Sequence, residues 1–122
     1  MNERSFIFAT AVRTRNEEKE QLVRQKTVEL VARYGLEGLS MHKLAKAAGV
    51  AAATLYIYFT DREDLLVQVC AEVTNRLLDT SLQGLTPDMS FAAGLRLQWR
   101  NRLAHYRQFP EEVAFTEHLR YS

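Results

Sequence analysis

The sequence predicts an all-α protein. Apolar residues recur at helical spacing along most of the chain, helix caps and glycines fall between these periodic segments, and no segment alternates convincingly in the manner of a β-strand. With 122 residues, of which 47% are hydrophobic and 25% charged, the chain is long enough for one domain, or for one small domain and part of a second. We therefore expect about six helices.

The first helix is expected to follow an irregular arm formed by residues 1–13. Thr14, with Glu17 three residues later, has the spacing of a capping box, and Asn16 is an alternative cap. The apolar stripe of this helix consists of Val23, Thr27, Leu30, Val31 and Tyr34. Gly35 is then predicted to end the helix in a left-handed conformation.

Two short helices are predicted next. Ser40 caps the first, which Gly49 ends, and the second runs through residues 52–59 with Leu55 and Phe59 facing inward. Two short helices joined by a tight, glycine-containing turn have the geometry of a helix-turn-helix. Because short helices are marginal in water, the first helix is expected to supply the surface on which they pack.

The second half of the chain is predicted to hold three further helices. The fourth helix is capped by Thr60-Asp61 and extends to about Leu82. Residues 86–88, Thr-Pro-Asp, are predicted to open the fifth helix with proline at its first position, and Pro110 begins the sixth.

Charge is divided unevenly along the chain. Residues 1–62 carry 10 Lys and Arg against 7 acidic residues, whereas residues 63–122 carry 6 against 8. This modest asymmetry indicates that a polyanion would be bound by the front half.

Other classes of function find little support in the sequence. It contains no glycine-rich phosphate loop, paired-histidine metal motif or nucleophile–base spacing, so we expect no enzyme, cofactor or metal site. Cys70, the only cysteine, lies in an apolar series and is expected to pack as a small hydrophobe. No run approaches the roughly 20 apolar residues of a membrane span, so we expect no membrane partner and a cytoplasmic protein.

The residues around the predicted turn form a long ordered pattern. It consists of Gly38-Leu-Ser-Met-His-Lys-Leu-Ala-Lys-Ala-Ala-Gly-Val50, Ala53-Thr-Leu-Tyr-Ile-Tyr-Phe59 and Asp61-Arg-Glu-Asp-Leu-Leu66. This pattern resembles the signature of the TetR family of bacterial transcriptional regulators over roughly residues 17–70. Beyond about residue 70 only the helical periodicity supports the extension.

The resemblance implies a homodimer whose recognition helices enter successive major grooves of a palindromic operator in double-stranded DNA. It divides the chain into an arm and DNA-binding domain in residues 1–62 and a helical regulatory domain in residues 63–122, joined by the long fourth helix. Because members of the family usually run well beyond 122 residues, we expect a fragment or a short member, with an incomplete regulatory domain.

The function that the resemblance implies is a ligand-responsive repressor whose small-molecule effector is unidentified. Two alternatives remain open. One is a constitutive DNA-binding or chromosome-associated factor, and the other is a short protein that heterodimerises with a longer relative and modulates it.

DNA binding needs cations and hydrogen-bond donors for phosphates, and a few side chains that reach base edges. The predicted DNA-binding residues are Ser40, Met41, His42, Lys43, Ala51, Ala52, Ala53, Thr54, Tyr56, Tyr58 and Arg62, with Arg13 and Arg15 from the arm. Within this set Thr54, Tyr56 and Arg62 resemble the phosphate contacts of the family. His42 stands where family members often reach a base.

The start of the recognition helix departs from the family, because residues 51–53 are all alanine where many relatives carry polar residues. Alanine cannot hydrogen-bond a base edge, although it can contact a thymine methyl group. This favours methyl contacts and recognition of DNA shape. Arg13 and Arg15 are then predicted to enter a narrow minor groove, with an unbound arm as the alternative.

Aromatic and cationic residues gather in the last two predicted helices. Four of them are candidate ligands for an apolar or anionic effector, namely Trp99, Arg102, Tyr106 and Phe115. The alternative is that this aromatic series belongs to the core, which is the commoner role of such spacing.

Overall fold

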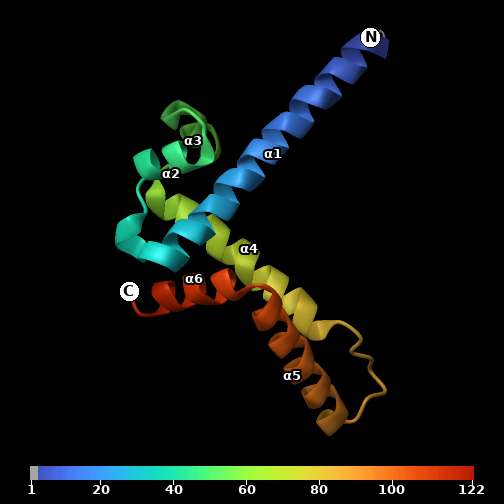
Figure 1. The fold of residues 1–122 in the computed structure, drawn as a ribbon. Helices are drawn as coiled ribbons and strands as arrows, with labels where there is room; N and C mark the ends of the chain where they lie inside the picture. The colour runs from blue at the N-terminus through green and yellow to red at the C-terminus, as the bar shows by residue number, and fades with distance from the viewer. Residues whose placement is uncertain (1–2) are drawn as a thin grey trace.

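The computed structural model describes the backbone of residues 3–122 and the side chains of residues 14–122. Within this range the chain is all-helical, as predicted, and contains no strand (Figure 1). The elements are α1 (Glu3–Tyr34), the 3-10 turn η1 (Leu36–Gly38), α2 (Met41–Ala48), α3 (Ala52–Tyr58), α4 (Arg62–Leu82), α5 (Phe91–Gln108) and α6 (Pro110–Arg120).

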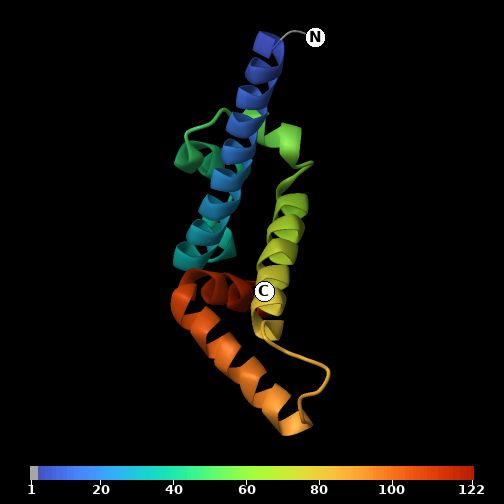
Figure 2. The same ribbon diagram turned by 90° about the vertical axis from the view of Figure 1, so that its right-hand side faces the viewer.

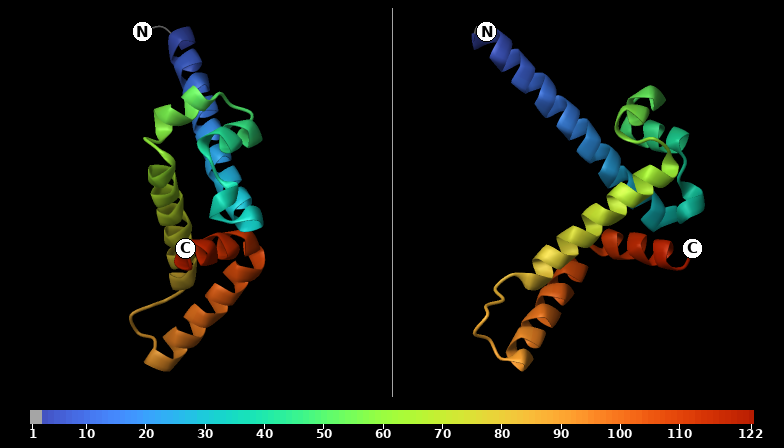
Figure 3. Two further views of the ribbon diagram at one scale, coloured as in Figure 1. Left: turned by 90° about the vertical axis from the view of Figure 1, so that its left-hand side faces the viewer. Right: turned by 180° about the vertical axis from the view of Figure 1, so that it is seen from behind.

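Helix α1 is longer than predicted. It begins at Glu3 rather than near residue 14, so the expectation of an irregular arm is wrong for residues 3–13. This segment contains neither glycine nor proline, and adding residues to an existing helix costs far less than starting one. The N-terminal turns of α1 extend past α2 and α3 (Figures 1 and 3).

The predicted helix-turn-helix is present. The Ser40 hydroxyl accepts a hydrogen bond from the Lys43 amide at 3.0 Å and caps α2. Gly49 adopts the left-handed conformation, with φ 70° and ψ 32°, and turns the chain into α3. Gly35 also has a positive φ, although its ψ of −177° leads into η1 instead of a left-handed cap.

A single apolar cluster holds α1, α2, α3 and the first half of α4 together. Its buried members are Val23, Val31, Leu39, Leu44, Ala45, Ala48, Leu55, Phe59, Leu65, Val69, Val73 and Phe115. Thr27 is buried among them, and its hydroxyl is satisfied by donating to the Val23 carbonyl at 2.9 Å. Tyr34, which the sequence placed in the apolar stripe of α1, is exposed instead. Phe115 brings α6 into this cluster.

Helix α5 packs against α4, and α6 lies against the C-terminal half of α1 (Figures 1 and 2). The fifth helix begins at Phe91, so the predicted start at residues 86–88 is wrong. Ser90 provides the cap, since its hydroxyl accepts from the Ala93 amide at 3.1 Å. Helix α6 begins at Pro110 as predicted. None of the described helices is long and apolar enough to cross a membrane.

Candidate nucleic-acid interface

The recognition helix α3 presents one face to solvent and one to the core. Leu55 is fully buried, whereas residues 51–53 are exposed, and so are Tyr56 at 55% and Ile57 at 77%. At 3.6 residues per turn, Ala52, Ala53, Tyr56 and Ile57 share the side opposite the core. This outward face is largely apolar, with the Tyr56 hydroxyl as its polar group.

The first turn of α2 contributes several of the other predicted residues. His42 and Lys43 are exposed, while Ser40 is half-buried because its hydroxyl caps the helix. Met41 is also half-buried and packs against the core, so its side chain is engaged in the fold. Thr54 is half-buried on α3, and its hydroxyl has no hydrogen-bond partner among the described residues.

Ile57 was not predicted as a DNA-facing residue, although it has the most exposed large side chain of α3. The signal was present in the sequence, because Ile57 is four residues from Ala53 and two from the inward-facing Leu55. An exposed isoleucine on a recognition helix can contact thymine methyl groups in the same way as the neighbouring alanines.

Tyr58 does not belong to this outward face. It is half-buried, its hydroxyl lies 3.5 Å from the Asn16 carbonyl oxygen of α1, and its ring meets the edge of Phe59. The position of Tyr58 on α3 turns its side chain toward α1, so its predicted role in DNA contact is not supported by the geometry.

Arg62 is also held against the protein. Its Nε donates to the Leu39 carbonyl at 2.9 Å, and its Nη2 donates to the Leu36 carbonyl. These bonds connect the start of α4 to η1 and to the residue before the Ser40 cap. Arg62 was predicted to bind phosphate, and in this geometry its side chain positions α2 relative to α4.

The arm arginines lie on α1 and not on an irregular segment. Arg15 is exposed on this helix. The side chain of Arg13 lies outside the residues whose side chains are described. Because α1 is continuous through both positions, the prediction of an arm that threads into a minor groove loses its structural basis.

The junction between α3 and α4 is fixed by reciprocal capping. Asp61 accepts from the Asp64 amide at 2.8 Å, and Asp64 accepts from the Thr60 amide at 2.9 Å. The hydrogen bond from the Thr60 backbone, with a second from the Gln68 side chain, lowers the pKa of the Asp64 carboxyl.

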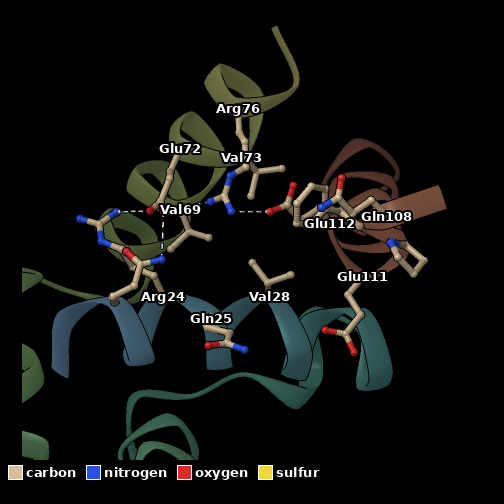
Figure 4. A pocket seen from close by; sticks show the side chains of 13 residues that line it. Arg24, Gln25, Val28, Val69, Glu72, Val73, Arg76, Gln108, Glu111 and Glu112 are labelled. Carbon is tan, nitrogen blue, oxygen red and sulfur yellow. Dashed lines mark hydrogen bonds and ion pairs between the residues drawn. The ribbon is translucent and has the colours of Figure 1, made fainter. Parts of the chain in front are cut away.

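A series of ion pairs runs from α1 through α4 to α6. Arg24 on α1 contacts Glu72 on α4 at 3.1 Å, and Glu72 contacts Arg76 at 3.0 Å. Arg76 reaches Glu112 of α6 at 3.0 Å, and Glu112 lies 3.3 Å from the buried His105 of α5. Four of these side chains, Arg24, Glu72, Arg76 and Glu112, line a pocket of about 470 Å³ between α1, α4 and the α5–α6 junction (Figure 4).

The start of this series lies beneath the recognition helix. The Arg24 guanidinium lies 5.3 Å from the ring centre of Phe59, the residue that follows α3, and it donates to the Glu20 and Gln68 side chains at 3.0 and 2.8 Å. Contiguous contacts thus connect α6 to the residue at the end of α3.

The predicted effector ligands are only partly brought together. Arg102 and Tyr106 line a smaller pocket of about 200 Å³ between α4, α5 and α6. Phe115 is fully buried in the core cluster, and Trp99 is exposed on the outer side of α5. The geometry does not place these two residues in the same pocket, because α6 turns Phe115 into the core and the opposite face of α5 packs against α4.

The two short helices, the left-handed glycine between them and the exposed face of α3 define a helix-turn-helix domain. Residues 19–69 match the family described as bacterial regulatory proteins, tetR family. Residues 19–69 therefore form a DNA-binding domain of the TetR type, as the sequence pattern predicted.

Similar proteins agree with this assignment. An uncharacterised HTH-type transcriptional regulator of Haemophilus influenzae is 40% identical over 75 residues, which are 62% of this chain and 40% of that protein. The fatty acid metabolism regulator protein of Bacillus subtilis is 36% identical over 52 residues, 43% of this chain and 27% of that protein.

A solved structure gives the same result for the fold. The chain is similar to a TetR family transcription regulator from Marinobacter aquaeolei VT8, with a TM-score of 0.82 and 34% sequence identity. This similarity covers 90% of the present chain and 58% of the Marinobacter chain. The chain thus spans well under two thirds of these relatives.

Proposed function

We propose that the protein is a sequence-specific DNA-binding transcriptional regulator that acts on DNA in the cytoplasm, binds a palindromic operator as a homodimer and has no enzymatic activity. The observation that carries the proposal is the outward face of α3, which is exposed to solvent and is positioned by α2 and the turn at Gly49. A recognition helix exposed in this way fits the major groove of B-DNA.

The chemistry of this face favours readout by shape and by methyl groups. Ala52, Ala53 and Ile57 offer no hydrogen bonds, so they suit thymine methyl groups and a sequence-dependent groove shape. The polar contacts would come from the edges of the face. Lys43 and Tyr56 are exposed there and suit phosphate oxygens.

We further propose that the regulator is a ligand-responsive repressor. An effector in the pocket lined by Arg102 and Tyr106 would contact α6 directly, because Glu112 and Thr116 also line it. Glu112 is the point at which α6 joins the ion-pair chain to Arg76 and onward to Arg24. Binding there would shift α6 against α1 and change the spacing of the two recognition helices in a dimer.

The first experiment is a selection of bound duplexes from a random pool at moderate salt. Enrichment of a palindrome with half-sites about one helical turn apart supports a dimeric, sequence-specific regulator. Enrichment of a single half-site would contradict the homodimer and leave DNA recognition intact. If binding remains weak, salt-sensitive and indifferent to sequence, sequence-specific recognition is wrong.

His42 provides a sharper test of base readout. We expect His42→Ala to change the base preference at one position in each half-site, because an imidazole in the first turn of α2 can donate to a purine edge. The matched control is His118→Ala, which removes an exposed histidine of α6. Identical selected sequences for wild type and His42→Ala would show that His42 reads no base.

A further inference from the structure

The outward face of α3 consists mainly of apolar side chains. Ala52, Ala53 and Ile57 have no polar side-chain atom, and Ile57, which is 77% exposed, is the largest of the three. The hydroxyl of Tyr56 is the polar group of this face. Because the other side chains cannot hydrogen-bond a base edge, their contacts with bases are van der Waals contacts.

The fold fixes the direction in which Ile57 points. Leu55 and Phe59, two residues to either side, are buried in the core, and the Phe59 amide donates to the Leu55 carbonyl at 2.9 Å. At about 100° per residue, Ile57 lies on nearly the opposite side of the helix from both. Its branched Cβ leaves one strongly preferred χ1 rotamer in a helix, so the methyl groups of Ile57 are held in a defined position before DNA binds.

The spacing of Ala53 and Ile57 matches neighbouring base pairs. They are four residues apart on the same side of α3, which is about 6 Å along the helix axis. Base pairs in B-DNA are stacked about 3.4 Å apart. The two side chains can therefore contact bases that are no more than about two base pairs apart.

The chemistry of Ile57 suits one feature of the major groove. Of the four bases, only thymine presents a methyl group there, and contact between that methyl group and Ile57 removes apolar surface from water without loss of a hydrogen bond. A cytosine amino group or a guanine acceptor atom in the same place would lose water without gaining a partner, which is unfavourable. Because Ile57 offers neither a donor nor an acceptor, it distinguishes bases by the methyl group and not by the polar atoms beside it.

On the basis of the sequence-specific DNA binding proposed above, we propose that Ile57, together with Ala53, is a specificity-determining residue that recognises the 5-methyl group of a pyrimidine in the major groove. The operator half-site then holds a thymine at this position, and 5-methylcytosine substitutes for it. The partner of this face is DNA, because the face belongs to the second helix of the helix-turn-helix within residues 19–69, which match the tetR family.

Recognition of DNA shape is the competing explanation for an apolar recognition helix. Segments rich in A·T pairs differ from others in groove width and stiffness, and a protein can select them without touching a methyl group. The two explanations differ in one respect. A direct contact couples the thymine methyl group to the Ile57 side chain, so that removing either one abolishes the contribution of the other, whereas an effect of DNA shape is independent of Ile57.

The experiment uses the full chain and a duplex enriched in the selection described above. Each thymine is replaced in turn by uracil, which pairs with adenine in the same way but lacks the methyl group. A second series places cytosine or 5-methylcytosine, each paired with guanine, at the same position. Fluorescence anisotropy at one salt concentration measures the affinities of wild type, Ile57→Ala and a matched control. The control, Leu78→Ala, shortens an exposed apolar side chain near the C-terminal end of α4, which lies away from α3 (Figure 1).

We expect uracil at one position of the half-site to weaken wild-type binding by about fourfold for each methyl group removed, which is the effect of exposing one buried methyl group. Ile57→Ala should bind the thymine duplex more weakly and should lose the uracil effect, whereas Leu78→Ala should behave as wild type. In the second series, 5-methylcytosine should bind about fourfold more tightly than cytosine. Unaltered helix content and unfolding midpoints of both variants show that folding is not the cause.

Failure of this proposal is distinguishable from failure of the proposed function. If no duplex is enriched, sequence-specific recognition is wrong and recognition of the methyl group is wrong with it. If a duplex is enriched but uracil changes nothing at any position, DNA recognition stands and only the methyl contact is wrong. A uracil effect that persists in Ile57→Ala would assign it to DNA shape, and equal binding of cytosine and 5-methylcytosine would show that the methyl group is not what Ile57 recognises.

Discussion

The DNA-facing unit and the α4–α5 hairpin bury their apolar residues very differently. The first, defined as residues 14–73, supplies every buried apolar side chain of the described core cluster except Phe115. In the hairpin, residues 77–108, the large apolar side chains are mostly exposed, including Leu78, Leu82, Leu85, Met89, Phe91, Leu95, Trp99 and Leu103. The first unit buries most of its apolar pattern, whereas the hairpin leaves much of its pattern exposed.

The difference shows that apolar residues at helical spacing predict an apolar face on a helix but do not predict which element packs against that face. Within the hairpin, α5 is held on the end of α4 and the following loop by a few polar contacts, such as those of Asn101, and by the close approach of Gly94 to Leu85. The DNA-facing unit is held by packing. Substitutions of the same type should therefore have different effects in the two regions.

The largest contrast is expected between two phenylalanines. Phe115→Ala should lower the free energy of unfolding by about 3–5 kcal/mol, because it empties a fully buried position of the core. Phe91→Ala, at an exposed position, should change it by less than about 0.5 kcal/mol. Chemical denaturation of both variants measures the difference. Equal losses would show that the hairpin has a closed core after all.

Substitution of Arg62 should change the free energy of unfolding more than it changes the salt dependence of DNA binding. Arg62→Ala should cost about 1–3 kcal/mol, since the carbonyls of Leu36 and Leu39 lose their donors. The salt dependence of DNA binding should keep its slope. Arg62→Lys is the control, because it keeps the charge but not the paired bonds. A slope that falls by about one unit in Arg62→Ala and not in Arg62→Lys would assign Arg62 to a phosphate instead.

Two helix caps allow the same substitution to be compared between the regions. Ser40→Ala should lower the free energy of global unfolding by about 1 kcal/mol, because the Ser40 hydroxyl caps α2 inside the cooperative core. Ser90→Ala removes the equivalent bond at the start of α5, and its effect should be confined to the amide exchange of α5. Global destabilisation by both would mean that the hairpin and the DNA-facing unit unfold together.

The smallest effect is expected at Asp64 and depends on pH. Because hydrogen bonds lower its pKa in the folded chain, the ionised carboxyl contributes stability above its unfolded pKa. That contribution is lost as the pH falls through the folded pKa. The stability difference between wild type and Asp64→Asn should therefore be present at neutral pH and vanish in strong acid. A difference independent of pH would contradict this role of the carboxylate.

Much of the local structure followed from short-range signals in the sequence. The Ser40 cap, the end of α2 at Gly49 and the proline at the start of α6 each depend on signals within one turn of helix, and each was predicted correctly. The extension of α1 to Glu3 was missed because residues 14–17 offer a capping signal that the continuous helix does not use.

Among the candidate site residues, helical periodicity was enough to expect residues 51–53 on the outside of α3 and Leu55 on the inside. It was not enough for Tyr58, Arg62, Trp99 or Phe115. The sequence gives no sign that Tyr58 lies beside Asn16, or that Arg62 meets carbonyls more than twenty residues away. Such contacts depend on how separate helices are placed.

The sequence by itself therefore determined the helices, most of their caps and the family pattern, because these depend on neighbours a few residues apart. The tertiary structure alone decided which apolar faces met. Helix α6 turned Phe115 into the core beneath α1, while α5 was placed so that Trp99 remained exposed. Periodicity specifies that a helix has an apolar side, and only the packing of the other helices decides whether that side is covered.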